Sequence, residues 1–334
     1  MPNVLVTGGA GYIGSHACAA LARAGYTPVT YDSLVHGHRW AVQWGPLVVG
    51  DLLDRSALAD AFHRWSPVAV MHFAAFAYVG ESVLDPAKYY RNNVMGSLCL
   101  LEAMRASGVD KLVFSSTCAI YGTPERLPLT EDHDHHPVNP YGASKSMVEQ
   151  MLADFDSAHG LRSISLRYFN AAGADDEGRV GESHDPETHL IPLVLAAAAG
   201  DRDSISVYGT DYDTPDGTCV RDYVHVSDLA DAHVLALEAL QKGAASRAYN
   251  LGNGRGFSVR QVIDAAERVT GKRIAVTEAA RREGDPAELV GDASRIRREL
   301  GWQPRIGRIE DIISSAWRWY LKGPPMDVET TNAD

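Results

Sequence analysis

A strand, a glycine turn and a helix follow one another at the start of the chain. The β-branched run Val4-Leu-Val-Thr7 leads directly into Gly8-Gly9-Ala10-Gly11-Tyr12-Ile13-Gly14, and the helical composition of 12–24 ends at Gly25. Glycines let a pyrophosphate approach the backbone, while the free N–H groups and the positive dipole end of the helix attract it. We therefore predict a dinucleotide-binding turn, with the spacing GxxGxxG rather than GxGxxG.

Short apolar runs alternate with helical stretches until Tyr168, after which Gly, Asp, Pro and Glu dominate. This alternation predicts an α/β fold, a Rossmann-type doubly wound parallel sheet with a smaller, partly interleaved α/β second domain. The apolar runs are 28–31, 47–49, 68–72, 111–115 and 163–167, and the expected helices are 52–65, 82–107 and 140–158. The expected division is 1–178 plus about 220–255 for the nucleotide-binding domain, 179–219 and 256–324 for the second domain, and 325–334 for a polar tail.

Composition excludes several partners. Lys and Arg number 31 against 43 Asp and Glu, so the net charge is −12 and the surface repels phosphate backbones. The longest uncharged apolar stretch, 190–199, is half the length that a membrane-spanning helix needs. We therefore expect neither a nucleic-acid nor a membrane partner. No basic and apolar leader precedes the glycine turn, so we expect a cytoplasmic protein.

Metal ligands with a recognisable spacing are not found. The four cysteines, Cys18, Cys99, Cys118 and Cys219, form no CxxC pair. The histidine-rich tract 131–136 lies in a polar loop without a complementary cluster of ligands. We therefore expect no disulfide framework and no bound metal.

Four polar residues indicate chemistry on a bound nucleotide. Asp32 closes the second predicted strand, where a carboxylate accepts both ribose hydroxyls and repels a 2′-phosphate, which favours NAD over NADP. Tyr141 and Lys145 share one face of a predicted helix. A lysine ammonium and a positively charged nicotinamide beside Tyr141 would lower its pKa and make it a base near neutral pH. Thr117 follows a predicted strand and is placed to bridge a substrate hydroxyl and Tyr141.

Seven ordered segments make the chain similar to the extended short-chain dehydrogenase/reductase family, and within it to the UDP-glucose (UDP-galactose) 4-epimerases. The resemblance implies an isomerase that uses NAD to epimerise C4 of a UDP-hexose, interconverting UDP-glucose and UDP-galactose through a transient 4-keto intermediate. It also implies a UDP-sugar partner bound by the second domain, and a homodimer formed through the helices 82–107 and 140–158. The segments are TGGAGYIGSH (7–16), HFAAFAYVGES (72–82), FSSTCAIYG (114–122), NPYGASK (139–145), LRYFNAAGA (166–174), GTDYDTPDGTCVRDYVHVSDLADAH (209–233) and RREGDPAELV (281–290).

The same resemblance assigns roles to single residues. The catalytic residues would be Tyr141 as the base, Lys145 as the ligand of the nicotinamide ribose that tunes the tyrosine, and Thr117 as the Ser/Thr partner. The other positions implied to contact NAD are Gly8, Gly11, Tyr12, Ile13, Gly14, Asp32, Ser33, Asp51, Leu52, Phe73, Ala74, Ala75, Asn92 and Tyr168. Besides Thr117 and Tyr141, the positions implied to hold the UDP-sugar are Asn170, His189, Leu190, Tyr208, Arg221, Arg282, Asp285 and Leu289. The two arginines among them are suited to form bidentate hydrogen bonds with diphosphate oxygens.

Two positions depart from the best-known bacterial pattern of the family. Ala77 replaces a lysine near the cofactor, which puts one cofactor contact in doubt. Leu289 is intermediate between the bulky and the small residues that are linked to tolerance of an acetamido group on the sugar. Acceptance of N-acetylated sugars is therefore left open.

Three alternative functions are weighed against hexose epimerisation. Several segments also resemble the UDP-xylose/UDP-arabinose 4-epimerases, and the sequence does not separate hexose from pentose. A sugar-nucleotide 4,6-dehydratase or a UDP-glucuronate decarboxylase is disfavoured because Cys118 and Ala119 stand where those enzymes carry carboxylates. A non-catalytic NAD-sensing protein is disfavoured because Tyr141 and Lys145 are both present.

Overall fold

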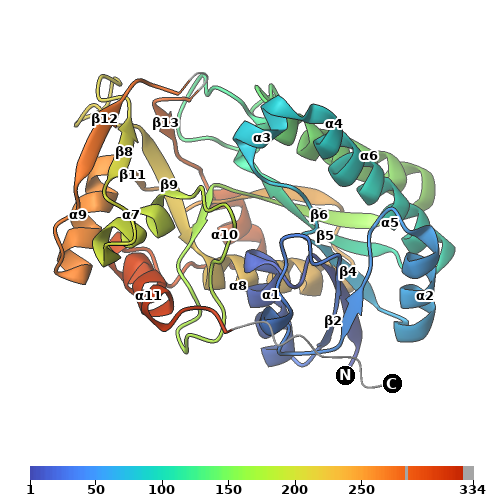
Figure 1. Cartoon of the computed structure of the whole chain (residues 1–334). Helices are drawn as coiled ribbons and strands as arrows, with labels where there is room; N and C mark the ends of the chain where they lie inside the picture. The colour runs from blue at the N-terminus through green and yellow to red at the C-terminus, as the bar shows by residue number, and fades with distance from the viewer. Residues whose placement is uncertain (283–284, 326–334) are drawn as a thin grey trace.

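A seven-stranded parallel sheet, with helices on both faces, lies beside two smaller sheets (Figure 1). The computed structural model describes residues 1–282 and 285–325. The strand order β10-β6-β5-β4-β1-β2-β3 reverses between β1 and β4, which is where doubly wound sheets bind ligands. The strands are β1 (Asn3–Thr7), β2 (Thr27–Asp32), β3 (Leu47–Val49), β4 (Ala69–His72), β5 (Lys111–Thr117), β6 (Arg162–Tyr168) and β10 (Arg247–Leu251).

Side chains of β1 alternate between two apolar cores. Val4 and Val6 lie in the cluster beneath α1 and α8, whereas Leu5 lies in the cluster beneath α2, α5 and α6. All three side chains are fully buried, as expected of a parallel strand covered on both faces. The predicted fold class is therefore confirmed. The covering helices are α1 (Tyr12–Arg23), α8 (Val226–Gln241), α2 (Arg55–Trp65), α5 (Gly96–Ala106) and α6 (Pro140–His159).

The smaller sheets are built mostly from the second half of the chain. Parallel pairs join β9 to β7 and β13, an antiparallel pair joins β9 to β11, and β8 pairs with β12 in a sheet of its own. Helices α7, α9 and α11 pack around a third apolar cluster. The strands are β7 (Asn170–Ala172), β8 (Ile205–Tyr208), β9 (Val220–His225), β11 (Gly256–Ser258), β12 (Val276–Ala279) and β13 (Glu288–Leu289), and the helices are α7 (Leu190–Ala199), α9 (Val259–Thr270), α10 (Ser294–Leu300) and α11 (Ile309–Lys322).

The segment 220–255, which we expected to lie wholly with the large sheet, divides between the sheets. Its helix α8 and strand β10 join the large sheet, but β9 lies in the small one. One partner of β9 is β13, far along the chain, so no local pattern signals the pairing. The expected domain boundaries stay a prediction.

Strand β9 runs into helix α8 without an intervening loop. His225 ends the strand and caps the helix, because its Nδ1 accepts a hydrogen bond from the backbone N–H of Ser227 at 3.2 Å. Helix α8 then packs along α1. The small sheet is thus joined directly to the helical layer of the large one.

The predicted helical stretch 82–107 is helical, but it is interrupted at Asp85 and contains a π-helical segment. The region consists of α3 (Val79–Leu84), α4 (Pro86–Tyr89), a π-helical segment η2 (Tyr90–Met95) and α5. Proline lacks the N–H that would continue α3, and the Asp85 carboxylate starts α4 by accepting from the Lys88 N–H at 3.2 Å. In the described part of the chain, no helix is both long enough and apolar enough to cross a bilayer.

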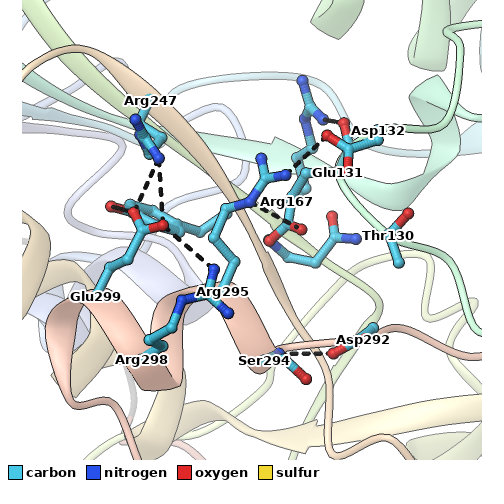
Figure 2. Close-up of polar contacts among 12 residues, drawn as sticks. Thr130, Glu131, Asp132, Arg167, Arg247, Asp292, Ser294, Arg295, Arg298 and Glu299 are labelled. Atoms are coloured by element: carbon cyan, nitrogen blue, oxygen red, sulfur yellow. Dashed lines mark hydrogen bonds and ion pairs between the residues drawn. The ribbon is translucent and has the colours of Figure 1, made fainter.

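Ion pairs connect α10 with β10 and with the loop around Glu131 (Figure 2). The guanidinium of Arg295 lies 2.8 Å from Asp132 and 3.5 Å from Glu131, and Arg247 lies 3.1 Å from Glu299. The Glu131 side chain is only 4% exposed, so a partly buried ion pair holds this loop against α10.

Candidate active site

The predicted glycine turn joins β1 to α1 at the carboxyl edge of the large sheet. Gly8 has a φ of +74°, and a Cβ there would lie 2.5 Å from the backbone nitrogen of Ala74. A Cβ on Gly14 would lie 2.1 Å from the carbonyl oxygen of Gly8. Gly11 caps α1 without a side chain, so no side chain occupies the first N–H groups of the helix. This backbone-lined cradle fits the pyrophosphate of a dinucleotide.

Asp32 ends β2 with its carboxylate buried beside the turn. Its oxygens accept hydrogen bonds from the backbone N–H of Ala10 at 3.0 Å and of Leu34 at 2.8 Å. Burial raises the pKa of Asp32, and these two donors oppose the rise. Each carboxylate oxygen retains a lone pair for a ribose hydroxyl. Ser33, the next expected contact, is exposed.

The segment 73–75 continues from β4 across the glycine turn. The backbone N–H groups of Phe73 and Ala74 both donate to the carbonyl of Thr7, at 2.8 and 3.0 Å. Tyr12, at the start of α1, donates from its hydroxyl to the carbonyl of Gly173 at 2.6 Å. These expected cofactor positions therefore surround one turn.

Asp51 and Leu52 follow β3 on the other side of β2. The carbonyl of Asp51 accepts from the Tyr31 hydroxyl at 2.9 Å, and its carboxylate accepts from the Leu53 N–H at 2.8 Å. Leu52 is buried against Gly96, the first residue of α5. The loop between β3 and α2 thus has a fixed conformation at the sheet edge.

Asn93 is a residue that the sequence reasoning missed. It is 2% exposed, and its amide donates to the Ser144 hydroxyl and to the Phe76 carbonyl, both at 3.0 Å. Its oxygen accepts from Asn92, an expected NAD contact, at 2.9 Å. Asn93 thereby joins η2 to the loop after β4 and to α6. Two adjacent asparagines inside a helical stretch were the available signal, because asparagine is a weak helix former, and π-helical segments are frequent at functional sites.

Thr117 and Tyr141 meet at the carboxyl end of β5. The Thr117 hydroxyl accepts from the Ala119 N–H at 3.1 Å and lies near the phenol of Tyr141, whose pKa it lowers. Tyr141 lies in the first turn of α6, where the Asn139 side chain caps the helix by accepting from the Gly142 N–H at 2.9 Å. The structure therefore brings the two residues together as expected of a base and its partner.

Lys145 lies one turn further along α6 and is 4% exposed. Its Nζ donates to the carbonyl of Ser115 at 2.8 Å and lies 4.9 Å from the ring centroid of Phe114. Burial lowers the pKa of Lys145 to about 7, and the carboxylate of Glu149 opposes that fall. The amine is thus close to its titration point at neutral pH.

The expected lowering of the Tyr141 pKa depends on a bound, oxidised nicotinamide and stays a prediction, because the protein's own groups act in the opposite direction. Burial raises the pKa of Tyr141 and the neighbouring Tyr168 adds to the rise, while the hydroxyl of Thr117 opposes it. The Lys145 amine bonds to a carbonyl of β5 instead of the phenol. Lowering this pKa therefore requires the positive charge of an oxidised nicotinamide.

Tyr168 ends β6 directly beside the end of β5. Its hydroxyl is hydrogen-bonded to the hydroxyl of Ser115, and burial raises the pKa of Tyr168 to about 12. The phenol therefore stays neutral at physiological pH and serves as a fixed polar group at the sheet edge.

A buried ion pair positions α6 against β6. Arg167 and Glu149 are 7% and 8% exposed, and the Arg167 Nε lies 3.0 Å from a Glu149 oxygen. The Ser116 hydroxyl donates to the same carboxylate at 2.5 Å, and Arg167 donates to the Tyr121 hydroxyl at 2.9 Å. Because every charge in this network is paired, it fixes the helix that carries the base relative to β5.

The small sheet brings together residues expected at the UDP-sugar. Leu289 of β13 is in register with Arg221 of β9, and Asn170 of β7 is in register with Tyr223 of the same strand. Leu289 and Cys118, the neighbour of Thr117 along the chain, both pack against the same small apolar cluster. The strand that carries Leu289 and the turn that follows Thr117 therefore share one cluster.

Two guanidinium groups lie on this side of the site, and one of them is paired with a carboxylate. Arg221 lies 2.5 Å from Asp285, and its other terminal nitrogen donates to the Val220 carbonyl at 2.8 Å. The guanidinium of Arg282 lies 4.1 Å from the ring centroid of Tyr208, at the end of β8. Both arginines lower the pKa of the Cys219 thiol, against the effect of burial, so both act on one small region.

His189 and Leu190 begin α7. Leu190 packs partly buried against the third apolar cluster. The imidazole of His189 lies 2.5 Å from Glu182 and belongs to a cluster of carboxylates and imidazoles. It is the one expected substrate residue whose described side-chain contacts all lie within that cluster.

The glycine cradle under a parallel sheet, with a Tyr-x3-Lys pair and a partner hydroxyl at its edge, defines an enzyme of the short-chain dehydrogenase/reductase type. Residues 4–252 match the NAD dependent epimerase/dehydratase family, and the chain belongs to this family. A UDP-glucose 4-epimerase of Rhizobium meliloti is 54% identical over 320 residues, which cover 96% of this chain and 97% of the relative. The resemblance to UDP-glucose 4-epimerases is thereby confirmed.

Solved structures share the whole fold. A UDP-glucose 4-epimerase from Brucella ovis in complex with NAD is 53% identical, with a TM-score of 0.93, and the match covers 95% of this chain and 98% of that one. A UDP-glucose 4-epimerase from Stenotrophomonas maltophila, with bound NAD and formylated UDP-arabinopyranose, is 42% identical with a TM-score of 0.93 and coverage of 96% and 98%.

Proposed function

We propose that this protein interconverts UDP-glucose and UDP-galactose by NAD-dependent inversion at C4. The observation that carries the proposal is the meeting of Thr117 and Tyr141 at the sheet edge, beside the glycine cradle and the apolar cluster that Cys118 and Leu289 share. The identity of 54% to a UDP-glucose 4-epimerase and the NAD complex of the Brucella enzyme support the same reaction.

The residues present fit NAD. A Cβ at Gly8 or Gly14 would collide with backbone, so the cradle is kept open for a pyrophosphate, and Asp32 is placed for the adenosine ribose. Lys145 would bind the nicotinamide ribose. When bound, NAD would supply a reversible hydride acceptor for C4 of the sugar.

Tyr141 is the proposed general base. It would take the proton of the sugar 4-hydroxyl, while Thr117 positions that hydroxyl and Lys145 provides positive charge for the phenolate. The product of this step is a 4-keto sugar. After the keto sugar has rotated, C4 would regain its hydride on the opposite face and Tyr141 would return the proton to the C4 oxygen, so the reaction has no net redox change.

The diphosphate stays bound while the keto sugar rotates about its bond to it. Arg221 and Arg282 are the proposed diphosphate ligands, because planar guanidinium groups bind phosphate oxygens in pairs. The remaining proposed substrate contacts are Asn170, His189, Leu190, Tyr208, Asp285 and Leu289.

A pentose substrate is the second candidate. The Stenotrophomonas relative is named a UDP-glucose 4-epimerase, yet it was crystallised with a formylated UDP-arabinopyranose. Dehydration is less favoured, because Cys118 and Ala119 follow Thr117 in the short helical turn η3 (Cys118–Ile120), and the buried Glu149 is already paired with Arg167.

The deciding experiment follows UDP-galactose and UDP-arabinose separately by proton NMR, using protein purified without added cofactor. Bound nucleotide is measured by absorbance after denaturation. Conversion of UDP-galactose to UDP-glucose with NAD present supports the proposal. A much faster pentose reaction reassigns the substrate, and bound NAD without either conversion overturns C4 epimerisation.

A homodimer is also part of the proposal. Large apolar side chains are exposed on adjacent elements α3, η2 and α6: Val83 at 60%, Leu84 at 88%, Met95 at 54% and Met147 at 47%. Exposed apolar side chains on neighbouring elements suit a second copy of the chain. The four cysteines of the chain are free, which suits a reducing compartment and the proposed cytoplasmic location.

A further inference from the structure

A compact cluster of two carboxylates and two imidazoles lies on the loop before α7. It is formed by Glu182, His184, Glu187 and His189, in the spacing Glu-x-His-x2-Glu-x-His. One ligand atom of each residue lies within 4.8 Å of the ligand atoms of the other three. We propose that this cluster binds a divalent transition-metal cation, of which Zn²⁺ is the best match. The sequence led us to expect no metal, because this loop has no cysteine pair and lies apart from the histidine-rich tract 131–136.

The distances suit tetrahedral coordination. Zinc binds imidazole nitrogen and carboxylate oxygen at about 2.0–2.2 Å, so neighbouring ligand atoms of a tetrahedron lie about 3.3–3.5 Å apart. The His184 Nδ1 lies 3.3 Å from Glu182 and 3.6 Å from Glu187. The His189 Nδ1 lies 3.5 Å from the other oxygen of Glu187, and its 2.5 Å contact with Glu182 must widen on binding.

One ligand atom, the Nδ1 of His184, contacts carboxylates only as ion pairs among the described residues. The Nδ1 of His184 is buried and lacks a hydrogen-bond partner of good geometry, although carboxylates surround it. Such an orphaned nitrogen is costly unless something binds it. Two imidazoles with two carboxylates select zinc and its neighbours over Mg²⁺ or Ca²⁺, which prefer an all-oxygen shell.

The loop is held in place from outside the cluster. The carbonyl of Glu182 accepts from the indole N–H of Trp319 at 2.8 Å, and the carbonyl of Ser183 accepts from the ring of His38 at 2.9 Å. The rings of Tyr12 and Tyr78 pack edge-on against His184, each with centroids 6.2 Å away. The cluster is therefore held in position before a cation binds, and it is shielded from solvent on one side.

An entry path for the cation exists on the other side. The Glu182, His184 and Glu187 side chains are 7%, 18% and 21% exposed, whereas His189 is 47% exposed. A bound cation would fasten the loop that leads into α7, beside Tyr12 of the glycine turn. Its expected role is to stabilise this part of the site, and it takes no part in the proposed proton transfer.

The test measures binding of ZnCl2 and CoCl2 to the full-length protein after treatment with EDTA and removal of the chelator. Calorimetry gives the stoichiometry and affinity for Zn²⁺, and Co²⁺ reports four-coordinate geometry through its visible absorption bands. The variants are His184→Gln and Glu187→Gln. The matched controls are His63→Gln and Glu177→Gln, which alter exposed side chains elsewhere.

We expect one equivalent of Zn²⁺ in the wild type and in both controls, with a higher thermal midpoint when the metal is bound. Each ligand variant should bind at least about tenfold more weakly and lose the Co²⁺ bands, while retaining bound nucleotide as evidence of folding. Absence of binding in the wild type would mean that the cluster is an ion-pair network alone. Undiminished binding in the ligand variants would place the metal elsewhere, and either result overturns the proposal whatever the enzymatic activity is.

Discussion

The amine of Lys145 is hydrogen-bonded to the backbone carbonyl of Ser115, 2.8 Å away. This contact ties the helix of the proposed base to the strand that ends in Thr117. Because the Lys145 side chain is buried and its pKa falls to about 7, its charge is sensitive to any neighbour that adds or removes charge. The lysine is therefore held in position by the strand before it meets a cofactor.

Replacing Tyr141 with Phe removes the proposed base and leaves the ring. We expect Tyr141→Phe to lose about 10²–10⁴-fold in turnover, the usual value of general acid–base catalysis, and to retain bound NAD. Proton NMR measures turnover, and absorbance of the released nucleotide measures NAD. Tyr320→Phe, which removes a hydroxyl bonded to Asp201 on the surface, is the control and should remain active. Near-normal turnover of Tyr141→Phe would show that Tyr141 is not the general base.

Replacing Gly8 with Ala tests the cofactor cradle. Its Cβ would lie 2.5 Å from the backbone of Ala74, so we expect loss of bound nucleotide as well as of stability. Gly25→Ala is a matched control, because Gly25 also has a positive φ, +85°, but has nothing within 4 Å of the added Cβ. That control should cost about 1 kcal/mol and keep its nucleotide. Equal nucleotide content in the two variants would contradict the cradle.

His72 makes stability depend on pH. It is buried between the hydroxyls of Thr7 and Ser97, at 2.6 and 2.8 Å, and burial lowers its pKa to about 3. The unfolded chain binds a proton at this histidine below about pH 6.5, whereas the folded chain does not until about pH 3. The free energy of unfolding should therefore fall as the pH drops through this window, by up to about 1.4 kcal/mol per pH unit from this residue.

The variant His72→Asn isolates that contribution. It should be less stable than the wild type at pH 7, since it loses both hydrogen bonds, yet its stability should fall less steeply between pH 6.5 and 4. Urea unfolding at several pH values measures the slope, and His63→Gln, on the exposed face of α2, should keep the wild-type slope. Identical slopes in all three proteins would show that His72 does not carry this dependence.

Leu289 is expected to limit the size of the sugar. Its side chain packs against the same apolar cluster as Cys118, the neighbour of Thr117 along the chain, so Leu289→Ala should enlarge the proposed site. We expect kcat/KM for UDP-N-acetylglucosamine to rise about tenfold or more relative to UDP-glucose, because one or two methylene groups are worth that much in a pocket. Leu321→Ala, 65% exposed on α11, should leave the ratio unchanged. An unchanged ratio in Leu289→Ala would show that this residue does not determine substrate preference.

The apolar face of α3 and α6 predicts the oligomeric state. Leu84→Glu and Met147→Glu place charges on side chains that are 88% and 47% exposed, so each should convert a dimer to a monomer while leaving the fold intact. Light scattering during size-exclusion chromatography measures the mass. Leu321→Glu should remain dimeric. A wild-type protein that is monomeric at micromolar concentration would refute the proposed interface.

Local patterns predicted the large sheet and the catalytic helix, but not the contacts that cross the fold. Val4, Leu5 and Val6 alternate between the two apolar cores, and this alternation can be predicted from neighbouring residues alone. The helix cap at Asn139 can likewise be recognised in the sequence. The pairing of Leu289 with Arg221 cannot, because it joins strands far apart in the chain. The hydrogen bond from Lys145 to the Ser115 carbonyl of β5 was not predicted either, because the sequence does not show which backbone group a buried lysine contacts.

The direct passage from β9 into α8 has a geometric consequence. Arg221 lies on β9, and α8 packs along α1, whose first turn lines the glycine cradle. One uninterrupted stretch of backbone thus spans from the proposed substrate diphosphate to the helix beside the proposed cofactor pyrophosphate. The fold therefore fixes the distance between the two phosphate-binding places. Hydride transfer requires the two reacting carbons to be close and aligned, so it would depend on this fixed distance.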